Sequence, residues 1–232
     1  MNKILNFQAE LINKIQLTDS ILQFEYKVPS ELVFTPGQFI GIRAIPTHTR
    51  AYSIVSLENN ILTLIVDVRP GGIASQYFEK VQVGEQTNIL GPYGIFKVKD
   101  TDLPKVFVST GSGIAPFIPM IKEVVKTRPQ IQIYNFFGSK DIKTDIAYSF
   151  LENILSDKCK YVNCISQEDI STLSQKNLHQ EIKQGRVTTV IPTYNFDWQN
   201  TEFYICGSSE MINDTKEVLT NLGVDKIYVE KY

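Results

Sequence analysis

The chain has 232 residues, which is enough for one large domain or two of ordinary size. Its formal net charge of −2 gives no attraction to nucleic acid or anionic lipid, and no apolar run approaches the ~20 residues of a transmembrane helix. The first residues lack the basic start and apolar stretch of a secretory signal. We therefore expect a cytoplasmic protein that neither spans a membrane nor binds nucleic acid.

Cysteine and histidine are too sparse for the common metal sites. The three cysteines are an odd number, which argues against a disulfide scaffold, and Cys159 and Cys164 have only the first spacing of a C-x4-C-x2-C run. The two histidines, His48 and His179, are not spaced as metal ligands. We expect no metal ion and no cysteine-ligated iron–sulfur cluster in this chain.

Residues 1–100 are typical of a small antiparallel β-barrel. Short runs rich in Ile, Val, Phe and Tyr alternate with turns containing Pro, Gly and Asn, such as Pro36-Gly37 and Gly91-Pro92. The predicted strands are Ile21–Tyr26, Gln38–Arg43, Ala51–Val55, Ile61–Val68 and Thr87–Leu90.

Residues 101–232 follow a different pattern, in which apolar strands alternate with helical periodicity. The predicted strands are Lys105–Ser109, Ile131–Phe137, Lys160–Ile165, Glu202–Cys206 and Lys226–Val229. The predicted helices are Ala115–Lys126, Asp145–Leu155 and Glu210–Leu222, the last ended by Gly223. Alternating elements predict an α/β domain with a parallel sheet and helices on both faces.

Two glycine-containing turns are suited to binding phosphate. In Val108–Pro116 a strand leads through Gly-Ser-Gly into a helix, whose first N–H groups carry positive potential. The third glycine of G-x-G-x-x-G is missing, so a plain strand–helix turn is the alternative. The stretch Arg69–Phe78 offers a second such helix start, with an ordinary hairpin turn as the alternative.

Three further segments contain groups that can contact a planar ligand. In Arg50–Ser56, Arg50 can bind phosphate, and strand alternation places Tyr52 on the same face and Ser53 on the other. A strand ends in Cys206-Gly207 just before a helix, and Tyr228–Tyr232 ends in an aromatic residue. The alternatives are an ordinary edge strand, a buried apolar cysteine and a frayed tail.

Taken in order, these segments resemble the ferredoxin–NADP reductase superfamily from about Gln38 to Tyr232. R-A-Y-S-I-V-S is similar to the flavin motif R-x-Y-S-x-x-S, and G-G-I-A-S and G-P-Y-G-I-F to the later flavin segments. T-G-S-G-I-A-P-F is similar to the nicotinamide motif T-G-T-G-I-A-P-F, C-G-S-S-E-M to C-G-x-x-x-M, and V-E-K-Y to the ending V-E-x-Y.

The resemblance implies an FAD-binding barrel followed by an NAD(P)-binding α/β domain. It implies that Arg50 binds the FAD pyrophosphate, Tyr52 packs on the isoalloxazine and Ser53 lies near N5. The implied catalytic residues are Ser53, Cys206, Glu230 and Tyr232. The implied cofactor-binding residues are Arg50, Ala51, Tyr52, Ser53, Val66, Gly71, Gly72, Ile73, Ala74, Ser75, Thr110, Gly111, Ser112, Gly113, Pro116, Ser139, Lys140, Ser166, Cys206, Gly207 and Met211.

One stretch departs from the pattern of NADP-specific relatives. Those relatives carry Ser-Arg after the third strand of the sheet, where this chain has Ser166-Gln167-Glu168. Gln167 has no charge to offer a 2′-phosphate, and Glu168 would repel it. Because Lys140, Lys176 or Arg186 could supply a cation instead, the choice between NADH and NADPH stays open at this point.

The function implied is an FAD-dependent enzyme that takes a hydride from NADH or NADPH and passes electrons to a separate carrier, ferredoxin or flavodoxin. Without an iron–sulfur domain in this chain, the acceptor is expected to be another molecule. The alternatives are an NAD(P)H:flavin reductase, an electron-transfer component of a larger oxidoreductase system, and a non-enzymatic flavin-binding protein. Gly71–Ser75 and the ending Glu230–Tyr232 favour the first function.

Overall fold

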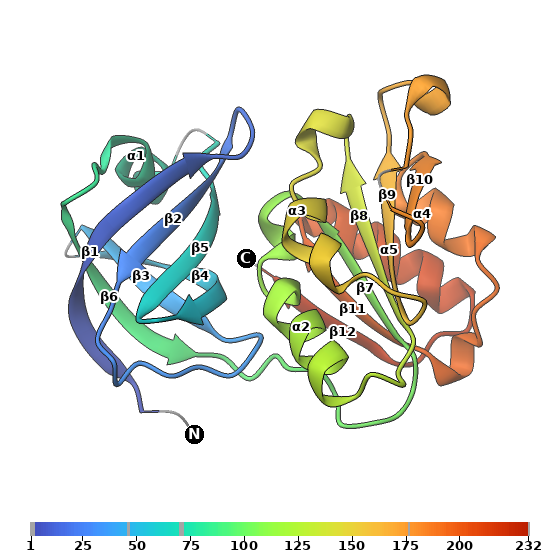
Figure 1. The fold of residues 1–232 in the computed structure, drawn as a ribbon, viewed down its shortest axis with the longest axis horizontal. Coiled ribbons are helices and arrows are strands. Elements are labelled where there is room, and N and C mark those ends of the chain that lie inside the picture. Colours follow the sequence, from blue (N-terminus) through green and yellow to red (C-terminus); the bar gives the residue numbers. More distant parts are fainter. Residues whose placement is uncertain (1–2, 46, 70–71, 176, 232) are drawn as a thin grey trace. The chain divides into compact units, whose positions relative to one another are not determined.

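The computed structural model describes residues 3–45, 47–69, 72–175 and 177–231. The chain divides into two compact units, Met1–Val98 with Ala115–Met120 and Lys99–Ile114 with Ile121–Tyr232 (Figure 1). Each unit has its own hydrophobic core.

The first unit is a closed antiparallel barrel with strand order β1-β2-β5-β4-β3-β6, as the sequence predicted. One helix, α1, connects β5 to β6. The elements are β1 Leu5–Gln16, β2 Ile21–Lys27, β3 Phe39–Ile45, β4 His48–Glu58, β5 Ile61–Asp67, α1 Ile73–Lys80 and β6 Gln86–Tyr93.

Helix α1 packs its one fully buried side chain, Phe78, into the barrel core. The ring of Phe78 meets Phe24 of β2 and Tyr52 of β4 edge to face, with centroid distances of 4.8 Å and 4.9 Å. This packing anchors α1 against β4, the strand that carries the predicted flavin motif.

The second unit contains a parallel sheet with strand order β10-β9-β8-β7-β11-β12. Helices α2 and α3 lie on one face of this sheet and α4 and α5 on the other (Figure 1). From Lys99 onward the helices and strands are β7 Lys105–Thr110, α2 Phe117–Thr127 (which the first unit shares as far as Met120), β8 Ile133–Ser139, α3 Tyr148–Leu151, β9 Cys159–Ile165, β10 Gln180–Gln184, α4 Val187–Val190, β11 Glu202–Gly207, α5 Ser209–Asn221 and β12 Ile227–Lys231.

The helix predicted over Asp145–Leu155 is wrong at its start, since α3 begins at Tyr148. Asp145 precedes the helix and its carboxylate accepts hydrogen bonds from the N–H groups of Ala147 and Tyr148, both at 3.2 Å. The same carboxylate accepts from the Tyr161 hydroxyl and from Asn163 Nδ2 of β9. Asp145 therefore ties the start of α3 to the sheet, as aspartate commonly does at helix starts.

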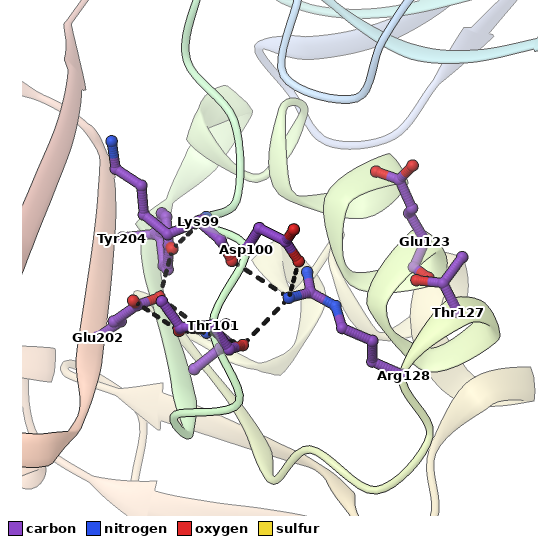
Figure 2. A network of polar contacts seen from close by, with 9 residues as sticks. Lys99, Asp100, Thr101, Glu123, Thr127, Arg128, Glu202 and Tyr204 are labelled. Carbon is purple, nitrogen blue, oxygen red and sulfur yellow. Dashed lines mark hydrogen bonds and ion pairs between the residues drawn. The ribbon is translucent and has the colours of Figure 1, made fainter.

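A buried polar network joins the first residues of the second unit to β7 and β11 (Figure 2). Lys105 pairs with Glu202, which also accepts hydrogen bonds from the hydroxyls of Thr101 at 2.8 Å and Tyr204 at 2.7 Å. The Tyr204 hydroxyl in turn accepts from the backbone N–H of Lys99 at 2.9 Å. The network fixes residues 99–101 against the beginning of the sheet.

Two negative findings apply to residues 3–45, 47–69, 72–175 and 177–231. None of their helices is long and apolar enough to cross a membrane. None of their His, Cys, Asp and Glu side chains gather in threes or more in a way that could hold a metal ion.

Candidate cofactor-binding sites

Strand β4 presents the residues of the predicted flavin motif. Arg50 is exposed, and in the described chain its guanidinium donates one hydrogen bond, to the Thr49 carbonyl at 3.2 Å, and forms no ion pair. Burial raises the pKa of Tyr52 to about 12, although the charge of Arg50 opposes the shift. Ser53 is buried, and its hydroxyl makes no hydrogen bond to any residue the structure describes. A cation and an uncommitted hydroxyl are therefore available on one strand.

The start of α1 leaves room for a phosphate group. Gly72 precedes the helix and no side chain caps it, so the first-turn N–H groups of Ile73, Ala74 and Ser75 lack intrahelical partners. Among the described residues, a Cβ atom added to Gly72 would have only Ser75 Oγ within 4 Å, at 3.8 Å. Free N–H groups beside open space suit the pyrophosphate of FAD.

Two residues of the predicted flavin set contribute less to this picture. Val66 lies in β5, and its side chain is buried in the barrel core. Gly71 lies outside the described residues.

The glycine turn after β7 packs directly on the end of β11. Gly111–Ile114 forms a 3₁₀ turn, and Pro116 lies just before α2. A Cβ atom on Gly113 would clash with the Cys206 carbonyl and lie 2.8 Å from Gly207 Cα. Only glycine permits this approach, so Gly113 holds the turn and its N–H groups against Cys206.

The turn after β11 is held just as closely. Gly207 has a φ of +154°, and a Cβ atom there would lie 2.5 Å from Met211 Cε and 2.7 Å from Thr110 Oγ1. Ser208 then caps α5 by accepting a hydrogen bond from the N–H of Met211 at 3.2 Å. The structure thus brings the predicted residues Thr110, Gly207 and Met211 together at the carboxyl ends of β7 and β11.

Ser109, Cys206 and Glu230 form a lateral row across β7, β11 and β12, because the parallel register pairs Cys206 with both other residues. Their side chains share one face of the sheet. Cys206 is fully buried and Glu230 is half-buried, and burial raises the pKa of the Glu230 carboxyl above its ordinary value. The row places the Cys206 thiol between the Ser109 hydroxyl and the Glu230 carboxyl, with the glycine turn packed on the backbone of Cys206.

Sequence reasoning did not single out Ser109. Its Oγ is buried and has no hydrogen-bond partner among the described residues. The signal in the sequence was a serine at the carboxyl end of the predicted strand Lys105–Ser109, next to the glycine turn. Tyr232, the other residue predicted at this end of the sheet, lies outside the described residues.

The ends of β8 and β9 are joined by hydrogen bonds. The backbone N–H and the hydroxyl of Ser166 both donate to the Ser139 carbonyl at 3.1 Å, and the N–H of Gln167 donates to the Lys140 carbonyl at 2.9 Å. The predicted residues Ser139, Lys140 and Ser166 therefore lie together at the edge where open α/β sheets bind ligands.

Two family models match consecutive parts of the chain. The oxidoreductase FAD-binding domain matches residues 8–98, and the oxidoreductase NAD-binding domain matches residues 107–217. The chain therefore carries the two domains of an FAD- and NAD-binding oxidoreductase. Its cofactors are FAD and a nicotinamide dinucleotide, and the open helix start at Gly72 and the glycine turn beside Cys206 fit them.

The chain is similar to several reductases of oxygenase systems. It is 26% identical to the toluate 1,2-dioxygenase electron transfer component of Pseudomonas putida, over 97% of this chain and 67% of that protein. It is 24% identical to the propane 2-monooxygenase reductase component of Rhodococcus jostii, over 88% of this chain and 57% of that protein. The chain thus spans little more than half to two thirds of the length of these relatives.

Solved structures share the fold. The Neisseria gonorrhoeae ferredoxin NADP+ reductase with bound FAD and NADP has a TM-score of 0.78 at 22% identity, over 97% of this chain and 98% of that one. The Amycolatopsis cytochrome P450 reductase has a TM-score of 0.87 at 18% identity, over 100% of this chain and 71% of that one.

Proposed function

We propose that this protein is a member of the ferredoxin–NADP reductase superfamily that takes a hydride from NADH or NADPH onto FAD and passes the electrons to a separate acceptor. Residues 1–100 form the FAD-binding domain and residues 101–232 the NAD(P)-binding domain. The cofactors supply the redox chemistry when bound, and the protein binds them, orients them and excludes water.

The observation that carries this proposal is the contact between the Gly113 turn and Cys206. It brings the backbone of a glycine turn at a strand end, where a pyrophosphate can bind, against a buried thiol, and the register adds the half-buried Glu230 next to that thiol. A dinucleotide whose phosphates bind at the turn would extend its nicotinamide toward Cys206.

Each predicted residue takes one role in this proposal. Arg50 and the start of α1 bind the FAD pyrophosphate, Tyr52 packs on the flavin and Ser53 donates a hydrogen bond to flavin N5. Cys206 lies beside the nicotinamide, and the Glu230 carboxyl holds or releases a proton close to it.

For the acceptor we propose a small electron carrier, ferredoxin or flavodoxin, in the cytoplasm. A second candidate is an electron-transfer component of an oxygenase system, which is supported by the names of relatives such as the toluate 1,2-dioxygenase component. An NAD(P)H:flavin reductase, which releases its flavin, is less well supported, because Arg50 and the start of α1 provide for two phosphates.

The test is anaerobic reduction of the FAD-loaded protein by NADH and by NADPH, followed by addition of ferredoxin, flavodoxin or free FMN. The proposal expects the flavin to bleach and a carrier protein to reoxidise it faster than free FMN does. Preferential reduction of free FMN would favour the flavin reductase, and an unreduced flavin would refute an oxidoreductase role.

A further inference from the structure

Glu168, just after β9, has a carboxylate that the backbone holds in place. Its Oε2 accepts a hydrogen bond from the N–H of Ile142 at 2.7 Å, and its own N–H donates to the Lys140 carbonyl at 3.2 Å. The loop that follows β8 thereby binds both the backbone and the carboxylate of Glu168, which lies in the loop that follows β9. Oε1 of Glu168 has no partner among the described residues.

Neighbouring acidic side chains are committed to their own loops. Asp141 Oδ1 accepts from the N–H of Thr144 at 2.9 Å in a capping box. Asp169 accepts from the N–H of Ser171 at 2.9 Å and from its hydroxyl at 3.0 Å. In the part of the chain the structure describes, Asp169 therefore uses both carboxylate oxygens within its own loop, whereas Glu168 is held by the neighbouring loop and keeps Oε1 for a ligand.

The strand order tells which part of a dinucleotide reaches Glu168. The glycine turn follows β7. Cys206 lies near the end of β11 on one side of β7, and β8 and then β9 lie on the other side. With the pyrophosphate at the turn and the nicotinamide at Cys206, the adenosine half must extend over β8 and β9. This step rests on the proposed function.

We propose that Glu168 makes the protein select NADH over NADPH. An ionised carboxylate only accepts hydrogen bonds, so Oε1 can accept from the 2′-hydroxyl of the adenosine ribose. The 2′-phosphate of NADPH brings negative charge to the same place and is repelled. Lys140 and Lys143 are exposed, and in the described chain neither pairs with Glu168.

The test compares binding of NAD+ and NADP+ to the oxidised, FAD-loaded protein by isothermal titration calorimetry. We expect NAD+ to bind at least about tenfold more tightly than NADP+, because one hydrogen bond to a charged group supplies a factor of about this size. Glu168→Gln keeps the side-chain length and should reduce the preference severalfold, while Glu168→Arg should reverse it. Asp169→Asn removes a neighbouring charge and should leave the preference in place.

The outcomes separate this inference from the proposed function. Equal affinities in the unmodified protein, or an unchanged ratio in Glu168→Gln, would overturn the role of Glu168 alone. If neither nucleotide binds or reduces the flavin, the proposed function fails, and the selectivity fails with it. FAD content measured for each variant shows that the barrel is unaffected.

Discussion

Lys105 and Glu202 form an ion pair with an Nζ–Oε2 distance of 2.8 Å, and their side chains are 0% and 1% exposed. Both residues begin strands, β7 and β11, that are neighbours in the sheet. Burial lowers the pKa of Lys105, and the hydrogen bond and charge of Glu202 oppose that shift. The short distance and the hydrogen bonds of both groups to Thr101, and of Glu202 to Tyr204, offset the cost of removing the two charges from water.

Breaking this pair should destabilise the second unit strongly. Lys105→Met or Glu202→Gln should each lower the free energy of unfolding by about 3–5 kcal/mol, because one buried charge is left uncompensated. The double variant should recover much of that loss. Urea unfolding measures the change, with Asp157→Asn at the exposed pair with Lys160 as the control, expected to cost about 0–1 kcal/mol. A single variant as stable as that control would contradict the prediction.

Arg50 and Ser53 should separate flavin binding from hydride transfer. Arg50→Ala should weaken FAD retention, since a hydrogen bond to a charged group is worth about 1.5–3 kcal/mol. Ser53→Ala should keep FAD and slow flavin reduction. Flavin occupancy and stopped-flow reduction distinguish them, and Lys27→Ala at an exposed site of β2 controls for loss of a surface charge. If the flavin of Ser53→Ala is reduced at the rate of the unmodified protein, Ser53 has no role in hydride transfer.

Gly113→Ala should weaken dinucleotide binding while FAD stays bound. The added methyl group clashes with the Cys206 carbonyl, so the turn must move away from β11. Gly72→Ala is the reciprocal variant, because its methyl group enters open space at the proposed pyrophosphate site and should weaken FAD instead. Calorimetric titration with NAD+ measures dinucleotide affinity, and flavin analysis measures FAD content, in both variants. A Gly113→Ala protein that binds NAD+ as tightly as the unmodified protein would contradict a dinucleotide site at this turn.

Glu230 should make stability depend on pH. Burial raises its folded-state pKa, so the neutral carboxyl contributes stability at low pH that is lost as the pH rises through that pKa. Glu230→Gln cannot ionise. Its stability relative to the unmodified protein should therefore be similar at low pH and increase as the pH rises. Urea unfolding across this range tests it, with Glu217→Gln at an exposed site of α5 as the control. A difference that does not vary with pH would argue against a buried Glu230.

The sequence predicted the two-domain architecture because most strands have strong hydrophobic patterns. It missed β1, although Leu5, Phe7, Ala9 and Leu11 alternate with polar residues, and a bulge between Leu11 and Asn13 interrupts that alternation. It also missed β10, whose sequence QEIKQ is polar and which lies at the edge of the sheet. An edge strand pairs on one side only and needs no apolar run.

The motifs indicated which segments to propose for cofactor binding, but the contacts between pairs of residues came from the structure alone. Lys105 lay in a run read as apolar, and nothing in the sequence connects it with Glu202. The hydrogen bond between Glu168 and Ile142 likewise depends on how two loops meet. The role of Tyr232 stays a prediction, since it lies outside the described residues.

Hydride transfer within the FAD-loaded protein is the central claim. Anaerobic stopped-flow mixing with NADH, and with NADH deuterated at the transferred position of C4, tests it most directly. We expect the flavin absorbance to bleach in one turnover and deuteration to slow the bleaching. A flavin that stays oxidised with both NADH and NADPH would contradict it.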